Sequence, residues 1–114
     1  MKHTIKFLKL ILFILIIFNQ VIFGQLNGSA KITGIVTDEE EKPIKDVKVK
    51  LFHLKAQMGM EKKTGKDGKW KAFKIRGGSW NIDFIKSGYQ TAKISLSIKE
   101  DGKAKIPTTL KRLK

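Results

Sequence analysis

Apolar and polar residues alternate through most of this 114-residue chain, and that alternation constrains the fold more than any other feature. Near the middle of the chain, Val47, Val49 and Leu51 occupy alternate positions, and Lys48 and Lys50 lie between them. A period of two is typical of a β-strand with one face packed and the other in water. Strands are predicted here and over residues 31–37, 55–64, 69–75, 80–84, 92–98 and 104–110.

Turn residues separate these runs at short intervals. Asp67-Gly68 supplies the positive-φ position that a tight hairpin requires. Pro107 cannot donate to a ladder, so the last strand is expected either to lie at a sheet edge or to end early. Six or seven short strands with such turns predict an all-β, seven-stranded Greek-key-type sandwich, a single domain over residues 31–112.

The tryptophans carry most of the apolar surface available for a core. Trp80 is in phase with the apolar residues two and four positions later, so its side chain is expected inside. Trp70 and Phe73 differ in parity, which predicts a bulge or twist near Ala72.

The N-terminus has the three parts of a secretory signal. The first nine residues hold three lysines and no acid, and an apolar run from Leu10 to Phe18 follows. A small residue completes the pattern, so we predict an apolar signal helix over residues 1–24, cut between Gly24 and Gln25. Cleavage after Ala30 is the second choice.

Two consequences follow for the mature chain. Residues 25–30 are expected to form a flexible leader, and the product is expected outside the cytoplasm, in the periplasm, on the surface or released. The alternative is an uncleaved membrane anchor. A bilayer span needs about 20 consecutive apolar residues, and Lys9, Asn19 and Gln20 interrupt this run.

The fold of the mature chain must be stabilised by its apolar core, because the chain has no cysteine for a disulfide. It is also strongly basic. Three of the 24 Lys and Arg residues lie in the predicted signal, and all 10 acidic residues lie after it, which leaves 21 against 10, or +11.

Several short motifs follow one another in order along residues 34–89. They are Gly34-x-Val36-x-Asp38, Pro43-Ile44, Val47-x-Val49, Thr64-x-x-Asp67-Gly68-x-Trp70, Gly78-x-Trp80-x-Ile82-x-Phe84 and Gly88-Tyr89. Together they resemble the carboxypeptidase regulatory-like (transthyretin-like, prealbumin-type) domain family. The resemblance implies a seven-stranded β-sandwich with an accessory or surface role. Glu41 and Asp46 depart from the family's glycines around the proline, which implies a different first loop.

The residue inventory argues against catalysis, a metal site or a cofactor. A zinc site needs several His, Cys or carboxylate ligands, and His53 is the only histidine after the signal. We interpret His53 as a half-exposed strand residue. No cysteine is present, and the serines have one histidine to act as base. The chain also lacks the C-terminal Tyr-Arg-Gly-Ser of the transthyretin-related hydrolases.

An acidic run, residues 38–41, is the remaining metal candidate, since calcium takes six or more oxygen ligands. Adjacent side chains of an extended loop point apart, so we interpret this run as a solvated loop.

Two aromatic residues could stack on sugar rings, as in the related starch-binding modules. They are Trp70, whose parity leaves its side unsettled, and Tyr89, which follows a glycine and is expected at a rim. The alternative is that both belong to the core.

Lysines occupy the outward positions of several predicted strands. A basic face is predicted from Lys48, Lys50, Lys69, Lys71 and Lys93, with Lys103 and Lys105 in similar positions. It serves either solubility and edge protection or binding to an anionic surface polymer. We therefore expect an exported, non-catalytic interaction domain that binds a protein or surface glycan and not nucleic acid. A carbohydrate-binding module is the alternative, and an enzyme is a remote one.

Overall fold

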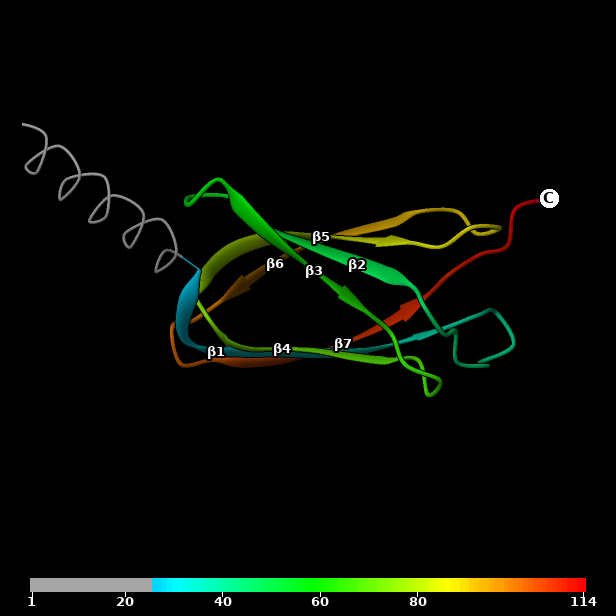
Figure 1. The fold of residues 1–114 in the computed structure, drawn as a ribbon, viewed down its shortest axis with the longest axis horizontal. Coiled ribbons are helices and arrows are strands. Elements are labelled where there is room, and N and C mark those ends of the chain that lie inside the picture. The colour runs from blue at the N-terminus through cyan, green and yellow to red at the C-terminus, as the bar shows by residue number, and fades with distance from the viewer. Residues whose placement is uncertain (1–25) are drawn as a thin grey trace, which may run out of the picture.

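The structure is a computed structural model that describes residues 26–114 as seven strands in two layers (Figure 1). The strands are β1 (Asn27–Thr37), β2 (Lys48–His53), β3 (Met58–Lys63), β4 (Lys69–Ile75), β5 (Gly78–Ile85), β6 (Ala92–Ile98) and β7 (Lys103–Thr109). The predicted signal peptide and its cleavage site between Gly24 and Gln25 lie outside the described residues. Within residues 26–114, no helix is long and apolar enough to cross a membrane.

One sheet has three strands in the order β4-β1-β7, and the other has four in the order β3-β2-β5-β6. The chain changes sheet after β1, β3, β4 and β6, so consecutive strands often lie in different layers (Figure 1). Strands β1 and β7 pair in parallel, and every other pairing is antiparallel. The predicted seven-stranded all-β sandwich is confirmed, and β7 with Pro107 is an edge strand as expected.

The core lies between the layers and follows the alternation of the sequence. Trp80, Ile82 and Phe84 all point inward from β5 and are fully buried, as predicted. Val49 and Leu51 lie beside Phe84 and Ile82 on the neighbouring strand β2 and are buried on the same face of the sheet. Burying one such large apolar side chain stabilises the fold by about 1.5–3 kcal/mol, and no disulfide contributes.

The predicted leader over residues 25–30 is wrong for its last four residues, which begin β1. Asn27 and Ala30 both pair with Ile75 across a bulge, and Ala30 is fully buried. The Arg76 N–H donates to the Leu26 carbonyl at 2.8 Å. The polar composition of this segment indicated a loop, but pairing with β4 extends the strand.

The bulge predicted near Ala72 is present in β4, one to two residues further on. Ile32 pairs with Ala72 and Ala30 with Ile75, so β4 has one more residue than β1 between these pairs. Lys74 takes a φ of 53° to accommodate it. Phe73 keeps the outward phase that follows Ala72 and is 47% exposed, and the bulge returns Ile75 to the core.

The third strand is shorter than the predicted range 55–64. A turn precedes it, in which the Gln57 N–H donates to the His53 carbonyl at 2.9 Å and Gln57 has a φ of 55°. The strand therefore starts only at Met58.

The sandwich is built within residues 26–114. Each of the seven strands has its sheet neighbours within this range, and the buried core cluster is drawn from both sheets. The experiments below therefore use residues 26–114 as the folding unit.

Candidate binding surfaces

Trp70 lies in the core and presents no open ring face for a sugar. Its side chain is 4% exposed, and its ring packs edge-on against Phe84 at 5.9 Å between centroids. The indole also lies where a side chain at Gly34 would be, since a Cβ there would come within 2.4 Å of Nε1. Of the two predicted stacking residues, this one is therefore enclosed.

Tyr89 is half-buried and is held by the C-terminal segment. It forms an isolated bridge with Arg112, whose guanidinium lies 6.0 Å from the centre of the tyrosine ring. The hydrogen bond with Tyr89 is the largest influence on Arg112 and raises its pKa, and nearby Asp38 acts in the same direction. One face of this ring is thus already occupied by a cation.

The outer face of the three-stranded sheet gathers lysines from all three of its strands. On the central strand β1, Thr33 pairs with Lys71 on one side and Lys105 on the other. Lys31 pairs with Lys103. We call these five outward lysines the lysine face: Lys31, Lys69, Lys71, Lys103 and Lys105.

No acidic residue belongs to β1, β4 or β7. The aromatic side chain of Phe73 lies among the lysines, with Lys31 Nζ 4.6 Å and Lys71 Nζ 5.2 Å from its ring centre. An open depression of about 870 Å³ overlies the face, and Thr33 and Ile35 are among the residues that line it. Lys62, Lys63 and Asp67 line it from outside the three strands, so one carboxylate borders the lysines.

The basic face predicted from sequence is wrong in its composition. Lys69 and Lys71 belong to the lysine face, whereas Lys48, Lys50 and Lys93 lie on the four-stranded sheet. The alternation of a strand identifies its outward positions but does not identify the sheet to which the strand belongs.

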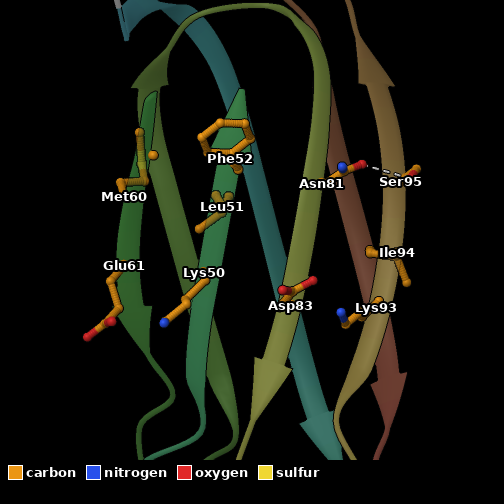
Figure 2. A pocket seen from close by; sticks show the side chains of 11 residues that line it. Lys50, Leu51, Phe52, Met60, Glu61, Asn81, Asp83, Lys93, Ile94 and Ser95 are labelled. Carbon is orange, nitrogen blue, oxygen red and sulfur yellow. Dashed lines mark hydrogen bonds between the residues drawn. The ribbon is translucent and has the colours of Figure 1, made fainter. Parts of the chain in front are cut away.

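One row of residues across the outer face of the four-stranded sheet alternates in charge, whereas Lys48 and Lys63 pair in another row. Glu61 pairs with Lys50, Lys50 with Asp83, and Asp83 with Lys93, so lysines and acids alternate across β3, β2, β5 and β6 (Figure 2). The positive charge of this face is therefore partly compensated, unlike that of the lysine face.

A second open depression, of about 820 Å³, lies on this alternating face (Figure 2). Its aromatic member is Phe52, which is 38% exposed and pairs with Gly59 and Asn81. Ser95 Oγ donates to Asn81 Oδ1 at 2.9 Å. Sequence reasoning missed Phe52 as a surface residue, although it is in phase with Lys48 and Lys50.

His53 is buried, not half-exposed as predicted, and both of its ring nitrogens have partners. Nδ1 accepts from the Ala56 N–H at 3.0 Å, so Nε2 carries the proton and donates to the Gly77 carbonyl at 2.8 Å. The ring meets Trp80 edge-on at 4.9 Å between centroids. Its role in this arrangement is to connect the end of β2 with the turn before β5.

Asp38 departs from the solvated-loop interpretation of the acidic run. It is buried, and its Oδ1 accepts the backbone N–H groups of Glu40 at 2.8 Å and Lys42 at 2.9 Å. The hydrogen bond from the Lys42 N–H lowers the pKa of this carboxyl most, against the opposing effect of desolvation. The glutamates at positions 39–41 are exposed, and residues 26–114 hold no group of three potential metal ligands.

The fold and these surfaces define a β-sandwich with two exposed sheet faces of different charge. No protein-family model matches the sequence, and neither does any curated protein. Solved structures do match in fold. The minor pilin of Streptococcus agalactiae has a TM-score of 0.60 at 15% identity, with 79% of this chain and 46% of that chain covered.

Two further structures widen the comparison. A DUF3823 family protein from Parabacteroides merdae gives a TM-score of 0.58 at 14% identity over 73% of this chain and 46% of that one. The 3-chlorocatechol 1,2-dioxygenase of Rhodococcus opacus gives 0.61 at 11% identity over 78% and 62%. The present chain thus spans less than two thirds of each, and the likeness establishes the sandwich fold alone.

Proposed function

We propose that residues 26–114 are a non-catalytic, extracytoplasmic binding domain that holds an anionic partner on the lysine face. The observation that carries this proposal is the segregation of charge between the two sheet faces. One presents five lysines on strands without a single acid, and the other places the carboxylates Glu61 and Asp83 among its lysines. The basic N-terminal segment and apolar run support export, and the motif resemblance to the carboxypeptidase regulatory-like family supports an accessory role.

The five lysines act as one charged patch because they are close together on the sheet. Neighbouring strands lie about 4.8 Å apart and alternate residues of a strand about 6.7 Å apart. Both spacings are shorter than the Debye length, about 8 Å at physiological salt. A polyanion on this face therefore interacts with several lysines at once, and its release of counterions makes binding fall steeply with salt.

The proposal is tested by binding to immobilised dextran sulfate over a range of NaCl concentrations. The triple variant K69Q/K71Q/K105Q removes three charges from the lysine face, and K48Q/K50Q/K93Q removes three from the opposite sheet. We expect the first to elute at clearly lower salt than the unchanged domain, and the second to elute close to it. Equal losses in both variants would show that net charge, not the lysine face, determines retention.

A neutral glycan on the opposite face is the second candidate function, and the depression around Phe52 is the observation that favours it. An exposed aromatic ring beside the Asn81 amide and the Ser95 hydroxyl combines an apolar surface with hydrogen-bonding groups, as carbohydrate sites require (Figure 2). A panel of neutral oligosaccharides tests it. Saturable binding that Phe52→Ala abolishes while the thermal midpoint is kept would support this site, and no binding across the panel would remove it.

A further inference from the structure

The central strand of the lysine face forms the floor of a lane. Along β1 the outward residues after Lys31 are Thr33 and Ile35, which carry no charge. The β4 lysines, Lys69 and Lys71, stand on one side of this floor. The β7 lysines, Lys103 and Lys105, stand on the other side. We call this arrangement the β1 lane.

The dimensions of the β1 lane suit one extended polymer chain. Its two sides are two strand spacings apart, about 9.6 Å between the backbones. Lys31 stands at one end beside Phe73, and Pro107 pairs with Ile35 at the other. Because the surface here is an open depression and not a plane, it favours a chain lying within it over a flat bilayer.

The chemistry of the lane points to an acidic saccharide. Its floor combines the Ile35 side chain and the adjacent Pro107 ring with the Thr33 hydroxyl, and so offers apolar contact for a sugar ring. The Thr33 hydroxyl donates to the Ala104 carbonyl at 3.5 Å, so its oxygen is offered to a sugar hydroxyl as an acceptor. Lysine is a point charge on a flexible stem, which suits carboxylates or sulfates at variable positions. Single-stranded nucleic acid instead requires aromatic platforms for its bases. The aromatic side chain on this face, Phe73, is flanked by two lysine ammonium groups.

We propose that the β1 lane binds an acidic polysaccharide chain, with its sugar rings over Thr33 and Ile35 and its acidic groups between the two rows of lysines. This inference rests on the proposed function of the lysine face. It adds the partner class, the direction of the bound chain along β1, and a contribution from uncharged floor residues.

The test compares polygalacturonate oligosaccharides with the same oligosaccharides after methyl esterification, which keeps the backbone and removes the charge. Binding to residues 26–114 is measured by isothermal titration calorimetry at two salt concentrations. We expect binding of the acid form only, weakened by added salt. K69Q/K71Q/K105Q should lose about fivefold or more in affinity, and the matched K48Q/K50Q/K93Q less than about twofold.

A floor variant separates a saccharide from other polyanions. Ile35→Thr keeps the charge and the β-branched shape but removes apolar contact, so polygalacturonate should bind about two- to fourfold more weakly. Poly-glutamate, which has no sugar ring, should be unaffected by this change. Circular dichroism of each variant verifies that the sandwich is retained.

The outcomes distinguish failure of the proposed anionic binding from failure of the saccharide inference. No binding to polygalacturonate, poly-glutamate or vesicles containing phosphatidylglycerol would overturn the proposed function together with the lane. Equal binding to all three, with Ile35→Thr neutral throughout, would overturn the saccharide inference and leave an unspecific anionic surface. Tighter binding to the vesicles than to either polymer would also overturn it, in favour of a membrane partner.

Discussion

Replacing Gly34 by alanine tests how tightly β1 is fitted between the Trp70 ring and strand β7. A Cβ at this position would lie 2.4 Å from Trp70 Nε1 and 2.6 Å from the Ile106 carbonyl oxygen. The ring is held in the core and the carbonyl belongs to a paired strand, so neither can withdraw without moving its neighbours. Overpacking of this kind costs about 1–3 kcal/mol, and two rigid obstacles place Gly34→Ala near the upper end.

Part of that cost is offset in the unfolded chain. Replacing a glycine lowers the conformational entropy of the unfolded state, which stabilises the fold by about 0.4–1 kcal/mol. A net destabilisation of about 2 kcal/mol remains. For a domain of this size each kcal/mol shifts the thermal midpoint by about 4–8 °C, so we expect Gly34→Ala to melt about 8–16 °C lower. Thermal unfolding followed by circular dichroism measures this shift.

Gly65→Ala is the matched control for the same substitution. A Cβ at Gly65 meets only Asp67 Oδ1, at 3.2 Å. This carboxylate is exposed and accepts the Lys69 N–H at 3.0 Å, and a small shift accommodates the methyl group, so this variant should melt within about 3 °C of the unchanged domain. The double variant Gly34→Ala/Trp70→Phe removes the indole nitrogen and should recover part of the loss. Equal midpoints for Gly34→Ala and Gly65→Ala would refute the placement of the Trp70 ring against β1.

Three further changes have expected outcomes that thermal or urea unfolding can check. The pKa of Asp38 is lowered in the fold. The ionised carboxylate therefore stabilises the fold at pH values above its unfolded pKa of about 3.9, and this stabilisation is lost as the pH falls through the folded pKa. Asp38→Asn should reduce this loss of stability in a series of thermal midpoints measured against pH. His53→Ala leaves the Gly77 carbonyl and the Ala56 N–H without their partner and should cost about 2–4 kcal/mol in urea unfolding, whereas a loss below 1 kcal/mol would contradict its structural role. K69Q/K71Q/K105Q should raise the midpoint at low salt by relieving like-charge repulsion, and K48Q/K50Q/K93Q should not; a lower midpoint for the first would contradict this.

The strands were predictable because their information is local. Trp80 and the apolar residues after it on β5 are inward in the sequence pattern and in the fold, since alternation fixes the side of the strand on which each residue lies. The parity conflict between Trp70 and Phe73 likewise indicated a real bulge in β4. The start of β1 was not predictable, because Asn27 and Ala30 owe their strand conformation to pairing with Ile75, far along the chain.

The candidate surfaces were less predictable, because they depend on how the sheets are assembled. Lys50 and Lys71 have the same local pattern, a lysine between inward apolar residues, yet the crossovers of the chain place them on different sheets. Phe52 could have been assigned to the surface from its phase, whereas the enclosure of Trp70 depends on Gly34 of the neighbouring strand.

The difference between the two faces is itself an argument about function. Solubility requires only that outward positions be polar. The four-stranded sheet meets that need along one row with lysines opposite carboxylates, which attract one another, while Lys48 lies opposite Lys63 in another row. The three-stranded sheet instead sets Lys31 opposite Lys103 and surrounds Thr33 with Lys71 and Lys105, an arrangement that costs stability through repulsion. An anionic chain in the β1 lane would remove that repulsion on binding. The same lysines that weaken the free domain would then stabilise the complex, so the gain in thermal midpoint on adding polygalacturonate should be largest at low salt and should be lost in K69Q/K71Q/K105Q.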